Sequence, residues 1–501
     1  MTNISSSLAS RLESAIGASH VVADPAVCSQ YAVDEIIPSV VAKPASAGQV
    51  AEIVRFAALE KLALIPCGHR TKLAIGMPPS RYDIALDMSG LHQIAHYDPG
   101  DLTVSVDAGL PLANVNAALF EHHQFLPLLV PWYSRSTIGG VISSGIDSPL
   151  RQAYGTARDF LIGAEFVDGT GRPCKSGGRV VKNVTGYDLH KLLIGSLGTL
   201  AVITRLNFRT FPAPPASRGF VASFPAGAGA LTLRHKIAES PLAPLTHDIL
   251  SPGLAQIFAS RTPGTPEVAV FSSENHTSTQ TFLPPIGDFF RTNEWQLCAA
   301  FGGAPEVLGR YGRDLTRLAE ESKATSISIL DDSARPSVWG RLRETVSMLL
   351  ETSPAAAIFK LSALPSQHAA LFTNLSEIAD RSALPHALVA RAAGVIYFAL
   401  LPPSNEHESL NTAPLQSLAE AASAVFTLCA EENASATLLW CPTQLKRQIN
   451  IWSPDFVAPA SSRDLSSSGS AAARRGVSLI RRLKSAFDPQ NIFAPGRLLS
   501  P

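Results

Sequence analysis

Three segments rich in glycine and other small residues lie within the first 210 residues of this chain of 501, and each is joined to a strand-like run. They are the loop 67–72, the run 134–145 and the turn 195–198. Glycine in such a segment lets the backbone approach a ligand closely, because no Cβ intervenes. The loop 67–72 also offers amide N–H groups and two cations to a phosphate. Each segment has a plain alternative, a packed or solvated turn without a ligand.

The runs between these segments predict regular structure. Apolar spacing predicts helices over the ranges 9–16, 49–61, 111–122 and 189–194. Strands are expected at 63–66, 84–88, 102–107 and 200–208, the third of them half-buried because its polar and apolar residues alternate. The run 40–44 ends at a proline, which is typical of an edge strand. The dipeptide Asp168-Gly169 is typical of a hairpin turn.

Composition excludes several classes of protein. Although 46% of the residues are hydrophobic, no run approaches the roughly 20 apolar residues of a membrane-spanning helix. The 41 basic and 41 acidic residues cancel, which argues against a nucleic-acid binder. The six cysteines contain no C-x-x-C pair, so neither a zinc knuckle nor an iron–sulfur cluster is expected. The first residues lack the pattern of a secretory signal, and a cytoplasmic location is therefore expected.

Four stretches resemble a single family when they are taken together. They read V-A-K-P-A-S-A-G-Q-V at 41–50, P-C-G-H-R-T-K-L at 66–73, S-T-I-G-G at 136–140, and K-N-V-T-G-Y-D-L with G-S-L-G-T-L-A-V-I-T within 182–204. The pattern resembles the FAD-binding domain of the PCMH type, also called the vanillyl-alcohol oxidase type, over roughly residues 35–215. The fourth stretch is most similar to the glycolate oxidase branch of that family. No G-x-G-x-x-G follows an early strand, so a Rossmann site is not supported.

The resemblance implies a set of residues that bind FAD. The pyrophosphate would contact the loop containing Gly68, His69, Arg70 and Thr71. More of the flavin would contact a second group of residues, which are Ser136, Thr137, Ile138, Gly139, Gly140 and Gly145. Ile203 would supply backbone contacts near the adenine.

The first loop departs from the family pattern. His69 and Arg70 stand where glycines are common, and Arg70 either adds a charge-assisted phosphate contact or partly blocks the loop. Thr71 aligns with the histidine that carries the covalent flavin link in some relatives. Non-covalent FAD is therefore expected, and a covalent link through His69 is the alternative.

The length predicts two or more domains, and the resemblance implies an α+β fold. A two-part PCMH-type FAD-binding domain would be followed by an α/β cap domain with a mainly antiparallel sheet. The expected divisions are an N-terminal helical segment at 1–34, the FAD-binding domain at 35–215, the cap at 216–457, a flexible linker at 458–473, and a C-terminal helix and tail at 474–501 that return to the FAD-binding domain. Alternating strands and helices in the cap, including a strand expected at 268–271, suggest two βαββαβ units.

Oxidation of a 2-hydroxy acid on a flavin needs a cation or metal for the carboxylate and a base for the hydroxyl proton. The cap histidines are isolated in sequence, so no metal site is expected; they are His235, His247, His276, His368, His386 and His407. Lys360 is the candidate for substrate binding, because an inward-facing charge on an apolar strand is costly without an anionic partner. An outward-facing, solvated lysine is the alternative. Arg341 and Arg343 are expected on the solvated face of a helix.

Two functional hypotheses follow from the resemblance. The first is an FAD-binding subunit of a glycolate oxidase complex that oxidises a small 2-hydroxy acid. Its partners would be a catalytic flavin subunit and an iron–sulfur subunit, and any contact with the inner face of the membrane would run through them. The second is a non-catalytic flavin subunit with a vestigial substrate site. A nucleotide-binding protein without redox chemistry is a third hypothesis, and it would be colourless.

Overall fold

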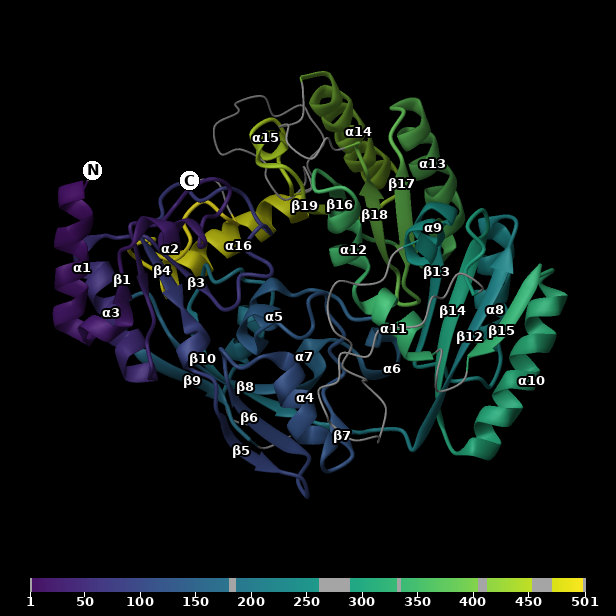
Figure 1. Ribbon diagram of the computed structural model, residues 1–501, viewed down its shortest axis with the longest axis horizontal. Coiled ribbons are helices and arrows are strands. Elements are labelled where there is room, and N and C mark those ends of the chain that lie inside the picture. Colours follow the sequence, from purple (N-terminus) through teal and green to yellow (C-terminus); the bar gives the residue numbers. More distant parts are fainter. Residues whose placement is uncertain are drawn as a thin grey trace.

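The computed structural model describes residues 2–179, 186–260, 289–330, 335–403, 412–452 and 471–498. Two bodies lie side by side (Figure 1). The first, here called the N-terminal region, comprises the described residues up to 215. The second, here called the cap, comprises the described residues from 216 to 452. The C-terminal helix lies against the N-terminal region. The strand expected at 268–271 and residues 458–470 of the linker expected at 458–473 fall outside the described residues, whereas residues 471–473 begin the C-terminal helix instead.

The first sheet of the N-terminal region has the strand order β1-β2-β4-β3. Its strands are β1 (Val21–Val22), β2 (Val40–Ala42), β3 (Leu64–Cys67) and β4 (Ile84–Asp87), and its helices are α1 (Thr2–Ile16), α2 (Pro25–Ser29) and α3 (Ala47–Glu60). Strands β2 and β3 each pair with β4 in parallel. The expectation of an edge strand at 40–44 is wrong, because β1 covers the free side of β2 and Pro44 lies beyond the end of that strand.

The second sheet is antiparallel, with the order β5-β6-β10-β8-β9. Its strands are β5 (Ile94–Asp98), β6 (Thr103–Asp107), β8 (Leu161–Val167), β9 (Pro173–Gly177) and β10 (Val202–Arg209). The hairpin turn at Asp168-Gly169 is confirmed between β8 and β9. Strand β6 is buried along its whole length rather than half-buried, since β5 and β10 flank it and Ser105 donates a hydrogen bond to Asn207 at 2.6 Å.

Short elements connect these sheets. They are α4 (Leu112–Phe120), α5 (Ile138–Ser144), α6 (Arg151–Tyr154), α7 (Ala157–Phe160), the paired strands β7 (Gln124–Phe125) and β11 (Phe211–Pro212), and the 3-10 turns η1 (Ala18–His20), η2 (Met88–Gly90) and η3 (Leu189–Leu193). The run 134–145 contains helix α5, because Thr137 caps it and four apolar or glycine positions within it are buried. This helix contributes to both cavities described below.

The cap is built on one antiparallel sheet of eight strands, in the order β15-β12-β14-β13-β17-β18-β16-β19. The strands are β12 (Ala216–Phe224), β13 (Thr246–Leu250), β14 (Trp295–Gly303), β15 (Ser326–Leu330), β16 (Ala357–Ser362), β17 (His386–Ala390), β18 (Val395–Leu400) and β19 (Ser435–Trp440). With helices α8 (Gly227–Glu239), α10 (Pro305–Glu321), α13 (His368–Arg381) and α14 (Thr412–Glu431), they form two βαββαβ units. The expected pair of units is thus confirmed, and β13 and β17 join them.

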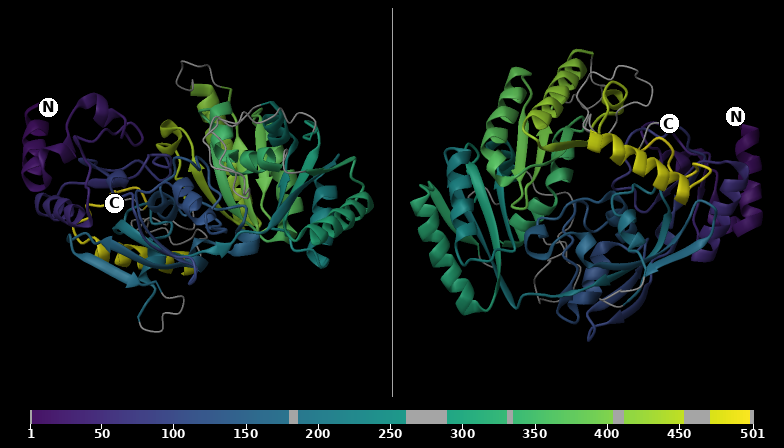
Figure 2. Two further views of the ribbon diagram at one scale, coloured as in Figure 1. Left: turned by 60° about the horizontal axis from the view of Figure 1, so that its bottom comes forward. Right: turned by 180° about the vertical axis from the view of Figure 1, so that it is seen from behind.

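The two faces of the cap sheet have different neighbours. Helices α8, α10, α13 and α14 cover the outer face (Figure 2). Phe359 and Leu361 of β16 pack among those helices, whereas Ile358 and its neighbour Tyr397 on β18 pack in a core shared with the N-terminal region. The remaining cap helices are α9 (Pro252–Ser260), α11 (Arg335–Arg343), α12 (Thr345–Thr352) and α15 (Thr443–Lys446), with the 3-10 turn η4 (Pro365–Gln367). Side chains of alternate residues on β16 therefore point toward the N-terminal region.

The C-terminal tail returns to the N-terminal region, as expected. Helix α16 (Ala471–Phe487) is followed by a segment in which Ile492 and Phe493 are fully buried in the core of the first sheet. The amide of Leu64 donates to the carbonyl of Ile492 at 2.8 Å, and the amide of Ala494 donates to the carbonyl of Leu64 at 2.9 Å. The tail thus extends the first sheet beside β3. The division of the chain into five domains stays a prediction.

Across the parts of the chain that the structure describes, no helix is both long enough and apolar enough to cross a lipid bilayer.

Candidate cofactor site

A cavity of about 90 Å³, open to solvent, lies where three segments of the N-terminal region meet the C-terminal tail. The segments are the loop after β3, helix α5 and the stretch from Leu197 to Ile203. The residues that line this first cavity are Ile65, Pro66, Cys67, Gly68, His69, Arg70, Thr71, Lys72, Leu73, Met88, Ala108, Thr137, Gly139, Gly140, Ser143, Ser144, Leu197, Gly198, Ala201, Ile203 and Arg497. Of the three small-residue segments singled out in the sequence, the loop 67–72 lines this cavity in full, and parts of the run 134–145 and of the turn 195–198 join it.

Two positions at the first cavity require glycine, because the walls of the cavity approach each other closely there. A Cβ on Gly68 would lie 2.1 Å from Oγ1 of Thr137, and a Cβ on Gly139 would lie 2.8 Å from the Cβ of Ala108. Real side chains do not approach so closely, so the loop after β3 sits directly against the start of α5. These small residues leave backbone exposed to whatever occupies the cavity.

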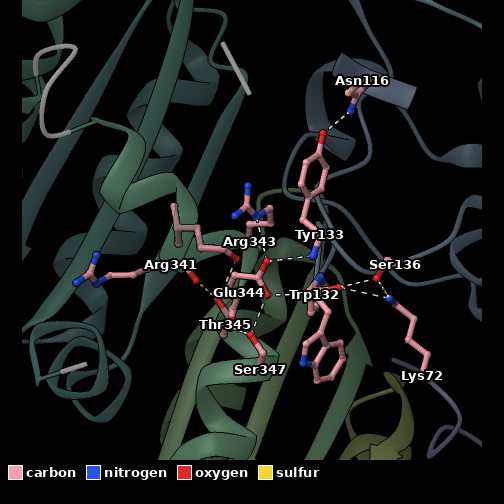
Figure 3. Close-up of polar contacts among 12 residues, drawn as sticks. Lys72, Asn116, Trp132, Tyr133, Ser136, Arg341, Arg343, Glu344, Thr345 and Ser347 are labelled. Carbon is pink, nitrogen blue, oxygen red and sulfur yellow. Dashed lines mark hydrogen bonds and ion pairs between the residues drawn. The ribbon is translucent and has the colours of Figure 1, made fainter. Parts of the chain in front are cut away.

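Lys72 connects the two loops at the base of the first cavity (Figure 3). Its ammonium donates to the carbonyl of Pro131 at 3.3 Å, to Oγ1 of Thr71 at 3.2 Å, and to Oγ of Ser136. The side chain is 9% exposed, and burial lowers the pKa of Lys72 to about 7, an effect that nearby Glu344 partly opposes. A lysine that can change its charge near neutral pH therefore lies against the cavity.

His69 and Arg70 are held at the margin of the first cavity. Nδ1 of His69 lies 2.9 Å from the carbonyl oxygen of Arg135. Arg70 has a φ of 62°, and its guanidinium stacks 4.3 Å from the ring centre of Tyr31. Both side chains line the cavity. Arg70 thus carries a fixed positive charge beside the opening, and its contact with a phosphate stays a prediction.

Arg497 reaches the first cavity from the C-terminal tail. One of its terminal nitrogens donates to the carbonyls of Leu73, at 2.7 Å, and Ile75. The other terminal nitrogen is buried without a hydrogen-bond partner among the described residues. Burial lowers the pKa of this guanidinium to about 10, so it stays charged at neutral pH. A buried cation with an unused donor indicates an anionic occupant.

FAD fits this arrangement. Its pyrophosphate carries negative charge, which suits the unused donor of Arg497 and the ammonium of Lys72. Its ring systems need apolar walls, which Met88, Ala201 and Ile203 supply. The glycines at 68 and 139 allow the close backbone approach that a bound dinucleotide requires.

The structure brings together most of the residues named from the sequence. Eight of them line the first cavity: Gly68, His69, Arg70, Thr71, Thr137, Gly139, Gly140 and Ile203. Ser136 and Ile138 are buried behind its wall, where Ser136 bonds Lys72, and Gly145 lines a second cavity instead. Sequence reasoning missed Arg497 as a cavity residue, and it included Lys72 only as one of the two cations of the loop 67–72. The contacts of the individual residues named from the sequence with FAD stay predictions.

Substitution of Gly68 by alanine tests the fit of the two loops. The new Cβ collides with the side chain of Thr137, so either the loop or the cap of α5 must move. We expect FAD affinity to fall at least tenfold, which corresponds to about 1.4 kcal/mol. The ratio of bound flavin to protein after gel filtration measures it. Gly178→Ala is the matched control, because nothing lies within 4 Å of its Cβ, and equal flavin retention in both variants would contradict the assignment.

Glu344 of the cap is inserted into the N-terminal region beside the first cavity (Figure 3). Its fully buried carboxylate accepts hydrogen bonds from the amides of Trp132, at 2.6 Å, and Tyr133, at 3.2 Å. It also accepts from Ser347 at 2.8 Å and pairs with Arg343 at 3.1 Å. The loop that Glu344 holds is the same loop whose Pro131 and Ser136 bind Lys72.

The expectation that Arg341 and Arg343 lie on a solvated helix face is wrong. Both are buried, with 2% and 4% of their surfaces exposed. Nε of Arg341 donates to the carbonyl of Phe258 at 2.8 Å, while Arg343 stacks on Tyr133 at 4.8 Å and pairs with Glu344. The polar composition of α11 suggested exposure, but the helix lies between the cap sheet and the N-terminal region.

Lys360 lies outside the first cavity. It lines a second cavity, which α5 also borders through Val141 and Gly145. The isolated cap histidines are dispersed, and His276 and His407 lie outside the described residues. Within the described ranges, no group of three histidine, cysteine, aspartate or glutamate side chains is placed to hold a metal ion.

Comparison with protein families identifies two matching segments. Residues 38–177 match the FAD binding domain, and residues 469–498 match the C-terminal domain of FAD linked oxidases. The first match contains the loop after β3 and the whole of α5, and the second contains Arg497. Both matches therefore include residues that line the first cavity.

Curated relatives match part of the chain. Glycolate oxidase subunit GlcE of Escherichia coli (strain K12) is 36% identical over 167 residues, which cover 33% of this chain and 47% of that protein. D-2-hydroxyglutarate dehydrogenase of Xanthomonas citri pv. viticola is 29% identical, over 43% and 46% of the two chains. D-lactate dehydrogenase of Archaeoglobus fulgidus is 33% identical, over 34% and 39%. The matches thus span less than half the length of these relatives.

Solved structures match the whole chain. p-Cresol methylhydroxylase with substrate bound has a TM-score of 0.71 at 16% identity, and covers 98% of this chain and 96% of its own. 4-Ethylphenol oxidase from Gulosibacter chungangensis has a TM-score of 0.70 at 15% identity, over 99% and 97%. At such low identity these likenesses establish the fold alone, whereas the match to the FAD binding domain indicates the cofactor. The chain therefore contains an FAD-binding domain within a fold similar to that of p-cresol methylhydroxylase.

Proposed function

We propose that this chain is the FAD-binding subunit of a glycolate oxidase-like complex that oxidises glycolate or a similar small 2-hydroxy acid to the 2-oxo acid. The observation that carries the proposal is the first cavity, where the matched FAD binding domain provides glycine-lined walls and Lys72, and the matched C-terminal segment provides the unused donor of Arg497. The matched relatives named above act, by their names, on glycolate, D-lactate and D-2-hydroxyglutarate. All three are 2-hydroxy acids.

The bound flavin supplies the acceptor for a hydride taken from the hydroxyl-bearing carbon. The chain must then hold the carboxylate of the acid and accept the proton of its hydroxyl. The cap places Lys360 on the side of its sheet that faces the N-terminal region. This position supports a role for Lys360 in substrate binding, the role for which the sequence analysis named Lys360 as the candidate.

The proposed partners are a catalytic flavin subunit and an iron–sulfur subunit. The cysteines at 28, 67, 174, 298, 429 and 441 are unpaired, and four of them are buried. They are dispersed over both bodies of the molecule, so they are not arranged to hold a cluster. One-electron transfer would therefore take place in another subunit.

The alternative is a non-catalytic FAD subunit with a vestigial substrate site, which serves assembly or electron relay. The isolation of the cap histidines in sequence favours it, because no H-x-H pair is available to a substrate-binding metal. Both hypotheses require bound FAD and differ only in whether substrate reduces it within this chain.

A visible absorption spectrum of the purified chain, before and after anaerobic addition of glycolate or D-lactate, separates these hypotheses. We expect a yellow protein whose flavin bands bleach with substrate. Bleaching only after the partner subunits are added would establish the electron-relay role. A colourless protein that stays colourless when FAD is added would contradict both hypotheses, and FAD released by heat would report non-covalent binding.

A further inference from the structure

A second cavity, of about 290 Å³, lies between the N-terminal region and the cap. Its lining residues are Leu128, Val141, Gly145, Ile146, Asp147, Ser148, Arg151, Gly155, Thr156, Ala157, Arg158, Lys191, Ile194 and Lys360. Only Lys360 comes from the cap. Helix α5 contributes Gly139 and Gly140 to the first cavity and Val141 to the second, so one short helix borders both.

Lys360 projects from β16 into the second cavity. On the neighbouring strand it lies opposite Tyr397, which packs in the core shared with the N-terminal region. Lys360 has no hydrogen bond or ion pair within the ranges that the structure describes. Burial lowers the pKa of Lys360, while nearby Asp147 acts in the opposite direction. A half-buried, unpaired ammonium in a cavity favours an anionic ligand over the alternative of a solvated lysine.

Asp147 presents a free oxygen in the wall of the same cavity. The residue is 8% exposed, and its amide donates to the hydroxyl oxygen of Tyr397 at 3.3 Å. One carboxylate oxygen accepts from Arg151 at 3.1 Å, whereas the other is buried without a hydrogen-bond partner in the described part of the chain. A buried carboxylate oxygen without a partner lacks the hydrogen bonds that water gives it in the unfolded chain. A ligand hydroxyl would restore one of them.

The second cavity carries more positive than negative charge. Four cations line it, and they are Arg151, Arg158, Lys191 and Lys360; Asp147 is the one acid in the lining. Arg151 is paired with Asp147, and Lys191 is paired with Asp188 at 2.8 Å. Beyond the wall lie Tyr397 of β18 and the buried pair of Asp248 and Arg391. The excess of positive charge around Lys360 suits a small anion.

We propose that the second cavity binds the carboxylate of a small 2-hydroxy acid through Lys360, and that the free oxygen of Asp147 accepts the proton of its hydroxyl group. This inference rests on the proposed function, because it assigns the ends of the substrate to residues of this chain. In this reaction the C–H bond would break and its electron pair would leave as hydride to oxidised flavin, the oxidant that the proposed function supplies. The O–H bond breaks with transfer of the proton to Asp147, and the C=O bond of the 2-oxo acid forms.

The first test measures binding without turnover. Oxalate carries carboxylates but cannot donate a hydride, so isothermal titration of the full-length, FAD-loaded chain with oxalate reports on the site alone. We expect Lys360→Met to weaken oxalate binding at least tenfold and Lys360→Arg to restore most of it. Lys236→Met is the matched control, because Lys236 is a cap lysine that pairs with Glu321 on the outer face at 3.0 Å. Equal affinity in wild type and Lys360→Met, or no binding to wild type, would overturn the assignment.

The second test separates proton transfer from binding. We expect Asp147→Asn to keep oxalate affinity within about threefold and to slow flavin reduction by a 2-hydroxy acid by about 10²–10⁴-fold, the usual size of a general base effect. Asp314→Asn, in an exposed pair with Arg310, should change neither quantity. An unchanged rate of flavin reduction in Asp147→Asn would refute the role in proton transfer.

These outcomes separate the inference from the proposed function. If flavin is absent or is never reduced, the proposed function fails, yet oxalate binding that depends on Lys360 still supports the site. If flavin is reduced equally well in Lys360→Met, with the same KM, the site is wrong and the function stands. A melting temperature for each variant ensures that a lost signal does not reflect unfolding.

Discussion

Replacement of Glu344 by alanine is expected to destabilise the protein by about 3–5 kcal/mol, the usual result of removing one partner of a buried ion pair. The change leaves the charge of Arg343 buried and removes the acceptor for the amides of Trp132 and Tyr133. Chemical denaturation and the melting temperature both measure the effect. The loop 131–136 also loses its hydrogen bonds to the cap through Glu344, so bound FAD should be lost more readily.

Two comparisons make the Glu344 prediction specific. Glu344→Gln keeps one oxygen but places an amide N–H group against a backbone N–H group, so we expect a loss of about 1–3 kcal/mol, between wild type and alanine. Glu321→Ala removes an exposed carboxylate that pairs with Lys236 and Arg317, and should leave the free energy of unfolding nearly unchanged. If Glu344→Ala were as mild as Glu321→Ala, Glu344 would not anchor the cap.

Local patterns were sufficient to predict much of the fold. The strands at 63–66 and 84–88 and the helix at 49–61 were predicted within a few residues, because hydrophobic spacing and flanking glycine or proline are local signals. The order of the two βαββαβ units in the cap was predicted for the same reason. Edge position is different, since it depends on which strand lies alongside. The expected edge strand at 40–44 proved interior because the two-residue strand β1, with almost no pattern of its own, covers it.

The site was predictable only where its residues are close in sequence. The loop 67–72 and the run 134–145 were recognised because small residues and glycines gather there. Arg497 gave no local signal, since its place in the first cavity depends on the return of the tail across more than 400 residues. Glu344 lies 212 residues from Trp132, and the sequence around Glu344 contains no pattern that indicates this contact. Composition was misleading for Arg341, because a polar helix can be buried where two bodies meet.

Lys72 is the residue through which pH should act on the cofactor. In the cofactor-free protein, burial lowers its pKa from an ordinary 10.5 to about 7, so the side chain loses its charge as pH rises through neutrality. Because the folded-state pKa of Lys72 lies below its unfolded-state value, the full cost of burying the charged side chain is present below pH 7. This cost is relieved as pH rises from 7 toward 10.5. The cofactor-free protein should therefore gain stability over that range.

Binding of FAD should favour the charged form of Lys72, whereas burial in the cofactor-free protein favours the neutral form. The pyrophosphate is expected to favour the charged ammonium, so binding above pH 7 takes up a proton at Lys72, and FAD affinity falls by up to about tenfold per pH unit. Below pH 7 the lysine is already charged and the affinity should level off.

In Lys72→Met, we expect FAD binding at pH 6 to weaken by about 10- to 100-fold, from loss of a charge-assisted hydrogen bond, and the slope above pH 7 to disappear. Fluorescence titration of the flavin-free chain at pH 6, 7, 8 and 9 provides both quantities. Lys175→Met, which alters an exposed lysine on β9, should keep the wild-type slope; a slope that survives in Lys72→Met would mean that another group takes up the proton.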